Sequence, residues 1–437
     1  MPRPNATGSL LVSINGAPIG RLSKARSGAI AFTYDDAWLA RETAFPVSLS
    51  LPLREDAYSG APVIAVFDNL LPDNADIRRR LAERARALGT DAFSILSAVG
   101  RDCVGAMQFT PESDPPGRPG APRGRTLSEA DVANLIRGLT EKPLGTDVDE
   151  DFRISIAGAQ EKTALLHVDG EWRAPIGASP TTHILKPQIG VLKNGIDLSH
   201  SVENEFLCLK LCEALGLKTA DAEIADFEDE RVLVVKRFDR LWTDDGRLLR
   251  VPQEDCCQAL SVPPTLKYEN EGGPGIVDLV ALLKAGDLPE IDVATFLRAQ
   301  IIFWAMGATD GHAKNFSVFL KPGGGFQLTP IYDVLTAQPQ IEAGQIRLGQ
   351  AKLAMAIGDK RRYRLDQIAP RHFQQTAKRA GVSETVISRI FEDLFARLDG
   401  LDSAMAAHDG VPGAEEFLAT VTRQIRRRIL LSTVNAE

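Results

Sequence analysis

The sequence predicts an α+β protein that is built in three successive parts. In the first 55 or so residues, short runs such as SLLVSI and AIAFTY alternate apolar and polar residues between Gly, Pro, Asn and Asp, which is typical of a small β-rich unit. A region of mixed strand and helix patterns follows, and helical patterns dominate the last third of the chain. Because 44% of the residues are hydrophobic and 25% are charged, the composition is that of a folded globular protein.

Proline and glycine mark the first boundary between these parts. The pattern becomes helical from about Val63, and NADIRRRLAERARAL (Asn74 to Leu88) predicts a helix with a charged face. The stretch PESDPPGRPGAPRGR (111–125) then has five prolines and three glycines in fifteen residues, which predicts an exposed linker or long loop. We therefore expect a first domain at residues 1–111. The change from mixed to helical patterns divides the rest into domains at 112–255 and 256–437.

Composition also narrows the classes of protein to consider. The net charge of −8 argues against a surface that coats nucleic acid throughout, although KRRYR (Lys360 to Arg364) and RQIRRR (Arg423 to Arg428) are candidates for local basic patches or solvated faces. The five cysteines form no CxxC pair, so a zinc site is not expected. The chain shows neither a signal peptide nor a run of about 18 apolar residues, which predicts a cytoplasmic protein without membrane contact.

A glycine-rich reversal near residue 323 predicts a β-hairpin. The strand-like runs NFSVFL and FQLTPIY are joined by KPGGG, whose glycines permit a tight turn. Folding the chain back at about Gly323 places Asn315 opposite Ile331, and Asp333 lies about 7 Å beyond that point. Asn315 and Asp333 are therefore expected to be neighbours, and both offer the oxygen ligands that Mg²⁺ prefers.

Asp310 follows the apolar stretch FLRAQIIFWAMGA and precedes Asn315 by five residues. Asp-x-x-x-x-Asn is the spacing of a kinase catalytic loop, in which a second Asp beyond the Asn is the other metal ligand. The alternative is an Asx-type turn at Asp310 and a capping role for Asp333. The three residues together, with the hairpin between two of them, favour a phosphotransferase. His312 is a lone histidine, so a metal hydrolase is not supported and a loop-ordering or nucleotide-contacting role is expected.

A phosphotransferase also needs groups that bind phosphate. SIAGAQEKTALL (Ser155 to Leu166) places small residues between two strand-like runs, and its backbone N–H groups could face an anion. With one glycine, this loop is a weak signal by itself. Lys186 ends an apolar strand in THILKPQ, where it would either contact phosphate or meet water at a strand edge. Glu203 or Glu205 could pair with it, and the sequence does not choose between them.

Six segments resemble the motif set of the HipA family, the serine/threonine-kinase toxins of type II toxin–antitoxin modules. They are SIAGAQEKTALL, THILKPQIG, ENEFLCLKL, VVKRFDR, GATDGHAKNFSVF and LTPIYDVL. The segments occur in the family's order, and the β-rich beginning and the total length also fit, so the resemblance covers essentially the whole chain. It implies a two-lobed, protein-kinase-like fold with a β-rich N-terminal subdomain and a mostly helical C-terminal lobe.

The resemblance implies roles for individual residues. Asp310 would be the catalytic base, Asn315 and Asp333 would hold Mg²⁺, and Ser155 would be the autophosphorylation site. A phosphate there would repel the phosphates of ATP. ATP would contact a phosphate-binding loop, a hinge and their neighbours: Ala157, Gly158, Ala159, Gln160, Glu161, Lys162, Lys186, Lys236, Arg237, Phe238, His312, Lys314 and Tyr332. Lys236 departs from the Glu that family members carry at the first hinge position, which puts a side-chain contact there in doubt but not a backbone contact.

The resemblance also implies partners. A small helix-turn-helix antitoxin of the HipB type would bind operator DNA and recruit this chain as co-repressor, so that DNA contact and nucleoid association would come mainly through the antitoxin. The substrate would be an aminoacyl-tRNA synthetase, and glutamyl-tRNA synthetase is the one expected. Its phosphorylation would block translation and lead to growth arrest and persistence.

Two other functions remain open from the sequence. A catalytically silent scaffold or co-repressor would have no need of Asp310, Asn315 and Asp333 together, and would transfer no phosphate to Ser155 or to any protein. A lipid or small-molecule kinase on a related two-lobed fold would act on purified lipids or metabolites and not on proteins.

Overall fold

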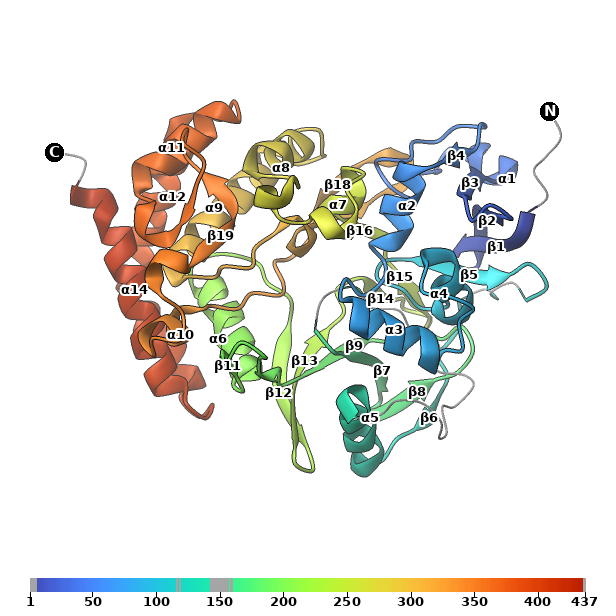
Figure 1. Ribbon diagram of the computed structural model, residues 1–437, viewed down its shortest axis with the longest axis horizontal. Coiled ribbons are helices and arrows are strands. Elements are labelled where there is room, and N and C mark those ends of the chain that lie inside the picture. The colour runs from blue at the N-terminus through green and yellow to red at the C-terminus, as the bar shows by residue number, and fades with distance from the viewer. Residues whose placement is uncertain (1–5, 115–116, 118, 142–156, 158–159, 435–437) are drawn as a thin grey trace. The chain divides into compact units, whose positions relative to one another are not determined.

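The computed structural model describes residues 6–114, 117, 119–141, 157 and 160–434. The chain forms two compact units that are discontinuous in sequence. The first unit comprises residues 1–187, 225–265 and 317–326, and the second comprises 188–224, 266–316 and 327–437. Helices and sheets occur in both units (Figure 1), which confirms the predicted α+β class.

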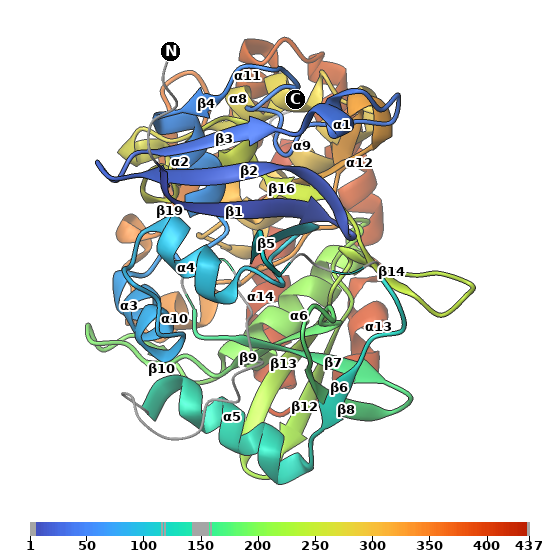
Figure 2. The ribbon, with the colours of Figure 1, turned by 90° about the vertical axis from the view of Figure 1, so that its right-hand side faces the viewer.

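The first unit begins with a five-stranded antiparallel sheet in the order β4-β3-β2-β1-β5 (Figure 2). Its strands are β1 (Ala6–Ile14), β2 (Ala17–Ala25), β3 (Ile30–Tyr34), β4 (Tyr58–Ser59) and β5 (Met107–Pro111). Asn15 and Gly16 join β1 to β2 with φ of 48° and 74°, as expected for an Asn-Gly hairpin turn. Phe67 packs between Phe32 and Phe109, with ring centroids 5.6 Å away on either side. The predicted β-rich beginning is thus confirmed.

Four helices accompany this sheet: α1 (Asp36–Leu39), α2 (Ala61–Asp68), α3 (Ala75–Arg84) and α4 (Ala92–Val99). The helix predicted from Asn74 to Leu88 is α3. Asn74 caps its N-terminus by accepting from the N–H groups of Asp76 and Ile77. The helix ends earlier than predicted because Arg86 takes a left-handed conformation, φ 52°, in which the helix cannot continue.

A six-stranded sheet follows in the order β12-β13-β9-β7-β8-β6. Its strands are β6 (Gly124–Thr126), β7 (Thr163–Val168), β8 (Glu171–Pro175), β9 (His183–Pro187), β12 (Ala222–Phe227) and β13 (Glu230–Lys236). Helix α5 (Glu129–Glu141) buries Val132 and Ile136 against Leu165, Leu185 and Val234 of this sheet. The unit also contains β14 (Arg240–Trp242), β15 (Leu248–Arg250), β16 (Gln253–Asp255), α7 (Cys256–Ala259) and β17 (Ser317–Leu320). The chain passes into the second unit within β18 (Phe326–Leu328).

The second unit is mostly helical, as predicted for the last third of the chain. Its helices are α6 (Ser201–Ala214), α8 (Ile276–Leu283), α9 (Pro289–Met306), α10 (Gln338–Glu342), α11 (Pro370–Arg379), α12 (Glu384–Arg397), α13 (Leu401–Met405) and α14 (Ala414–Val434). Short strands pair as β10 (Gly190–Val191) with β11 (Asp197–Leu198), and β19 (Lys352–Ile357) with β20 (Arg362–Arg364). Helices α8, α12 and α14 pack on α9, whose side chains are buried on nearly all sides from Phe296 to Met306.

Arg428 of α14 is a charged residue that is buried in the core of this unit. Its guanidinium donates from Nη1 to the carbonyl oxygens of Trp304 at 2.8 Å and Ala305 at 3.1 Å, at the C-terminal end of α9. Those carbonyls lie in the last turn of the helix, at the negative end of its dipole, where the N–H of Gly307 reaches Trp304 O only at 3.3 Å. Burial lowers the pKa of Arg428 to about 10. One arginine of the RQIRRR segment is therefore structural.

Candidate active site

The loop that carries Asp310 begins where α9 ends. Gly307 closes the helix in a left-handed conformation, φ 78°, and its N–H donates to Phe303 O at 2.9 Å. Asp310 follows three residues later with its side chain exposed. A Cβ on Gly311 would lie 2.5 Å from the ring of Phe303, so only glycine lets the chain turn this close to α9. Asp310 is thus placed at the start of a loop after a buried helix, as predicted.

Asn315 joins the two predicted aspartates. It ends the short 3₁₀ helix Ala313–Asn315, and its side-chain Nδ2 donates to the backbone carbonyl oxygens of Asp310 at 2.9 Å and of Asp333 at 3.3 Å. Because the amide nitrogen makes these two bonds, the amide oxygen is the atom that Asn315 can offer to a cation. The structure therefore brings Asp310, Asn315 and Asp333 together within the second unit.

The hairpin between Asn315 and Asp333 is also confirmed. Strands β17 and β18 are neighbours in one sheet, and the N–H of Lys321 donates to Gly325 O at 2.8 Å across the reversal. The second strand is shorter than predicted, because it ends at Leu328 before Pro330, which has no N–H to donate. Ile331 instead forms a parallel bridge with Thr219.

The segment after that bridge holds Asp333 in a strained position. Asp333 has φ of 59°, in the left-handed region that non-glycine residues seldom adopt. Its neighbour Tyr332 donates its hydroxyl to Lys314 O at 2.7 Å, which ties the two segments a second time. Lys314 and His312 are buried on the same loop. Residues held in such conformations cluster at functional sites.

The oxygen atoms of this site fit a hard divalent cation. The Asn315 amide oxygen and the Asp333 carboxylate are ligand types that suit Mg²⁺. Among the described residues, no group of three or more His, Cys, Asp or Glu side chains could hold a metal ion, and all five cysteines are buried thiols. A zinc-type centre therefore finds no ligand set in the described part of the chain.

Tyr268 is a site residue that the sequence did not indicate. Its hydroxyl donates to Asp310 Oδ1 at 2.5 Å, and its ring packs edge-on against His312 with centroids 5.0 Å apart. Tyr268 lies 42 residues before Asp310 in a segment without hydrophobic periodicity. No local pattern could have found it.

In the first unit, part of the predicted phosphate-binding loop is described. Ser155, Gly158 and Ala159 lie outside the described residues, whereas Ala157, Gln160, Glu161 and Lys162 lie within them. The Gln160 side chain donates from Nε2 to Pro187 O at 2.9 Å, and Glu161 forms an ion pair with Arg80. Gln160 thus joins the loop to the end of β9, where Lys186 is 7% exposed.

The predicted hinge follows β13. Lys236 is exposed, and Phe238 packs edge-on against Phe319 with ring centroids 5.8 Å apart. Arg237 lies between them, and its N–H donates to Thr182 O at 2.8 Å. The Arg237 side chain is 4% exposed and belongs to a buried network. At this position the backbone carbonyl, rather than the N–H or the side chain, is therefore the group that a ligand could use.

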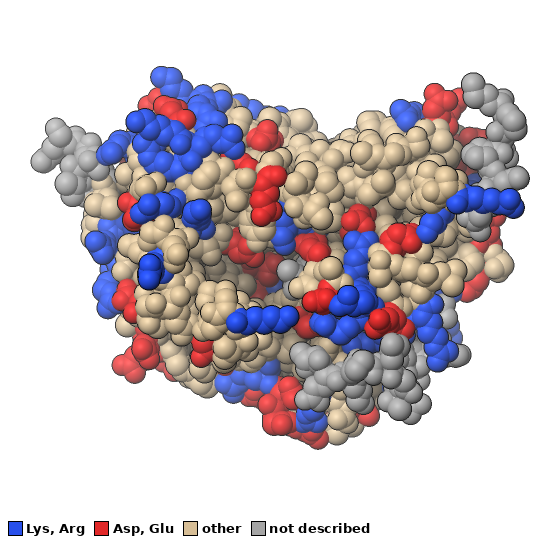
Figure 3. Space-filling model, viewed as in Figure 1, with Lys and Arg blue, Asp and Glu red and all other residues tan. Residues whose placement is uncertain are grey.

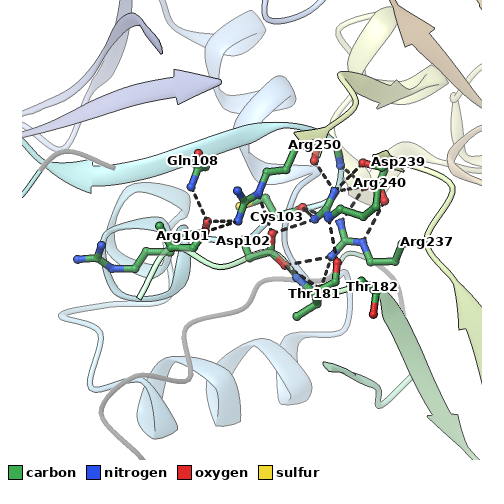
Figure 4. Close-up of polar contacts among 12 residues, drawn as sticks. Arg101, Asp102, Cys103, Gln108, Thr181, Thr182, Arg237, Asp239, Arg240 and Arg250 are labelled. Atoms are coloured by element: carbon green, nitrogen blue, oxygen red, sulfur yellow. Dashed lines mark hydrogen bonds and ion pairs between the residues drawn. The ribbon is translucent and has the colours of Figure 1, made fainter. Parts of the chain in front are cut away.

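That buried network centres on Asp102, in the loop after α4 (Figure 4). Asp102 Oδ1 accepts from Arg240 Nη2 and Arg250 Nε, both at 2.9 Å, while Oδ2 accepts from Thr181 N at 3.0 Å and Oγ1 at 2.7 Å. Arg237 Nη1 lies 3.3 Å from Oδ2. Burial by itself would raise the pKa of Asp102, but the charges of Arg240, Arg250 and Arg237 outweigh it and hold the pKa well below its usual range.

Asp239 completes the network. It accepts from Arg237 Nε at 3.0 Å and Nη2 at 2.8 Å, and from the N–H of Gly105 at 2.7 Å. The hinge segment is therefore tied through its own side chains to the 102–105 loop of the same unit. The sequence did not indicate this, because charged residues are seldom fully buried unless they are paired.

The two basic segments singled out in the sequence are largely paired with acidic groups. Arg361 contacts Glu269 at 3.0 Å, Arg364 contacts Asp366 at 2.6 Å and Arg426 contacts Asp402 at 2.8 Å. On the face drawn in Figure 3, Lys and Arg side chains gather over α11 with Asp and Glu among them. Among the described residues, no helix is both long and apolar enough to cross a membrane.

Comparison with known proteins identifies relatives over most of the chain. The family models described as HipA N-terminal domain and HipA-like C-terminal domain match residues 10–110 and 154–400. Y4mE of Sinorhizobium fredii is 36% identical over 389 residues, which are 87% of each chain. The serine/threonine-protein kinase toxin HipA of Shewanella oneidensis is 29% identical over 78% of this chain and 77% of its own.

A solved structure has the same fold. A chain in the complex of Shewanella oneidensis HipA, HipB and operator DNA superposes with a TM-score of 0.79, covering 98% of this chain and 99% of that one at 23% identity. The two chains therefore share one fold over nearly their whole lengths.

Proposed function

Because the chain belongs to the HipA family of serine/threonine-kinase toxins, we propose that it transfers the γ-phosphoryl group of ATP to a serine or threonine hydroxyl of a protein. One observation carries the proposal. A single side chain, that of Asn315, bonds to the backbone carbonyls of both Asp310 and Asp333. These two bonds join the backbone of the candidate base to that of a candidate metal ligand, and the three residues follow the chain order of a protein kinase, which supports the proposal.

The candidate site residues of the second unit each have a role in this reaction. Asp310 accepts the proton of the attacking hydroxyl as its oxygen bonds to the γ-phosphorus and ADP leaves. The Asn315 amide oxygen and the Asp333 carboxylate hold Mg²⁺, which neutralises charge on the phosphates when it is bound. His312 and Lys314 lie on the loop of Asp310, and Tyr332 is bonded to that loop through Lys314 O. These three are the residues of this unit that we assign to ATP.

In the first unit, we assign the loop Ala157–Lys162 and Lys186 to the phosphates of ATP, and the backbone of Lys236–Phe238 to its adenine. Backbone recognition at the hinge suits the exposed Lys236 and the buried Arg237 side chain. We further propose that the chain is organised as domains 1–111, 112–255 and 256–437. The assignments to ATP predict altered ATP affinity when the side chains named for it are removed.

Regulation and partners extend the proposal. Autophosphorylation at Ser155 would switch the kinase off, because a dianionic phosphate would repel those of ATP. A HipB-like antitoxin would hold the chain at operator DNA and account for nucleoid association of an otherwise cytoplasmic protein. The substrate would be an aminoacyl-tRNA synthetase, first of all glutamyl-tRNA synthetase. Phosphoproteomics during expression of the wild-type chain would identify it.

Replacement of Asp310 by Asn tests the chemistry. The variant keeps the size of the side chain but removes the base, so we expect phosphate transfer to protein and growth arrest to be lost together while ATP binding is retained. Asp399→Asn, an exposed change in the same unit, is the matched control and should behave as wild type.

Several outcomes would contradict the proposal. Full transfer and full growth arrest by Asp310→Asn would remove Asp310 from the mechanism. A wild-type chain that binds ATP and Mg²⁺ but labels no protein would be a silent co-repressor. Labelling of purified lipids or metabolites without labelling of proteins would place the enzyme in another kinase class.

A further inference from the structure

Tyr268 contacts the candidate base directly, although it comes from a distant part of the chain. We propose that Tyr268 is a positioning residue for phosphoryl transfer: its hydroxyl holds Oδ1 of Asp310 so that Oδ2 accepts the proton of the substrate hydroxyl. This inference rests on the proposed kinase function and deepens it. The 2.5 Å bond from the Tyr268 hydroxyl to Asp310 Oδ1 is its starting point.

An exposed aspartate needs such a partner to serve as a base in one orientation. The terminal torsion of an Asp side chain has a broad energy minimum, so the two oxygens of a solvated carboxylate exchange places readily. An ionised carboxylate can accept several hydrogen bonds, and Tyr268 uses one oxygen only. The backbone carbonyl of Asp310 is fixed separately by Asn315 Nδ2 at 2.9 Å and by the N–H of His312 at 2.7 Å. Asp310 is therefore held at its backbone and at one carboxylate oxygen.

Tyr268 is itself held in place at its ring and at its backbone carbonyl. Its ring packs edge-on against His312, two residues after Asp310. Its backbone carbonyl accepts from the N–H groups of Glu271 at 3.1 Å and Gly273 at 2.9 Å, which closes a tight turn. A Cβ on Gly273 would lie 1.8 Å from Leu266 O, so the turn requires glycine. A hydroxyl on such a turn keeps its position when the substrate arrives.

The neighbouring residue Glu269 anchors this turn to the sheet of β19 and β20. Its carboxylate accepts from the N–H of Ala356 in β19 at 2.5 Å and from Arg361 Nη2 at 3.0 Å. Arg361 lies in the reversal between the two strands and belongs to the KRRYR segment. A line of contacts thus runs from a basic surface turn through Glu269 and Tyr268 to Asp310, all within the second unit.

If the Tyr268 hydroxyl instead blocked the substrate position, its removal would have the opposite effect on the rate of phosphoryl transfer. If the Tyr268 hydroxyl stood where the substrate hydroxyl must bind, it would compete with the substrate, and its removal would increase the rate. A purely structural role would instead lower stability or ATP affinity. The three roles therefore separate in kinetics.

Tyr268→Phe is the decisive variant, because it removes the hydroxyl and keeps the ring that packs on His312. With the full-length chain, Mg²⁺–ATP and a generic serine-containing protein acceptor such as casein, we expect kcat to fall about 10- to 100-fold, the loss typical of one hydrogen bond to a charged group. KM for ATP and the thermal midpoint should stay at their wild-type values. Tyr58→Phe, which removes a hydroxyl bonded to Pro52 O in the other unit, should leave kcat unchanged.

Each remaining outcome overturns the inference. An unchanged kcat would show that Asp310 needs no partner, and an increased kcat/KM for the acceptor would show competition. A loss confined to KM for ATP, or a lowered thermal midpoint that accounts for the lost activity, would show a structural role. Asp310→Asn in the same assay separates these results from a failure of the proposed function, since a wild-type chain as inactive as Asp310→Asn refutes both proposals together.

Discussion

Replacing Asp102 by Asn removes the central charge of the buried network in the first unit. Asp102 faces Arg237, Arg240 and Arg250, and the side chains of all four are at most 4% exposed. The amide keeps one acceptor oxygen but turns an NH₂ group toward donors that were satisfied by the carboxylate. Three guanidinium groups are then balanced by Asp239 alone.

The expected cost follows from this arrangement. Removing one partner of a buried ion pair costs about 3–5 kcal/mol, because the remaining charge stays desolvated. For a unit of this size, such a loss lowers the unfolding midpoint by roughly 10 °C. Because Arg237 also belongs to the predicted hinge, we expect ATP affinity to fall in parallel. Calorimetry and urea unfolding of the full chain would measure the first effect, and nucleotide titration the second.

The matched control is Asp114→Asn. Asp114 pairs with Arg101 near the same loop, but its side chain is 63% exposed, so the change should cost less than about 1 kcal/mol. Equal unfolding midpoints for Asp102→Asn and Asp114→Asn would refute the reasoning. The stability difference between Asp102→Asn and wild type should also shrink below about pH 4. Because the pKa of Asp102 is lower in the folded than in the unfolded chain, its carboxylate stabilises the fold above the unfolded-state pKa, and this stabilisation is lost as the pH falls through the folded-state pKa.

Three further predictions concern other buried groups. Burial raises the pKa of Glu254 to about 8, so its contribution to stability is present below about pH 4.5 and is lost as the pH rises toward 8. The unfolding free energy of Glu254→Gln should therefore rise by a few kcal/mol relative to wild type between pH 5 and pH 8. Parallel curves of unfolding free energy against pH for the two proteins would contradict this. Gly311→Ala should place a methyl group against the ring of Phe303, lowering stability by about 1–3 kcal/mol and kcat with it, and a fully active variant of wild-type stability would contradict the steric argument. Arg428→Met should leave the last carbonyls of α9 without their buried donor at a cost of about 1–3 kcal/mol, and unchanged urea unfolding would show that water replaces it.

The sequence predicted the centre of the candidate site because the determinants are local. Asp310 and Asn315 lie five residues apart on one loop, and a glycine-rich hairpin returns the chain to Asp333. Spacing and turn chemistry are sufficient for such an arrangement. The helix α3 ends before the predicted Leu88. The sequence did not predict this end, because nothing in it marks Arg86 as the residue that leaves the helix.

The features that the sequence missed depend on contacts between distant segments. The bond from Tyr268 to Asp310 spans 42 residues, and Asp102 meets partners 135 to 148 residues away. Charged residues ordinarily lie exposed to solvent, and only the folded chain shows which opposite charges offset the desolvation cost of a buried one. The same holds for Arg428, which a basic sequence run placed on the surface.

The left-handed backbone at Asp333 has a consequence for the history of chains like this one. An L residue is disfavoured in that conformation by about 1–2 kcal/mol, while glycine is not, and Asn and Asp are the side chains that tolerate it best. Folding alone would thus prefer glycine here, and only chemistry favours a carboxylate. In relatives that have lost phosphoryl transfer, we expect this position to drift to Gly or Asn before the surrounding core changes, so that one codon distinguishes a silent descendant from a working enzyme.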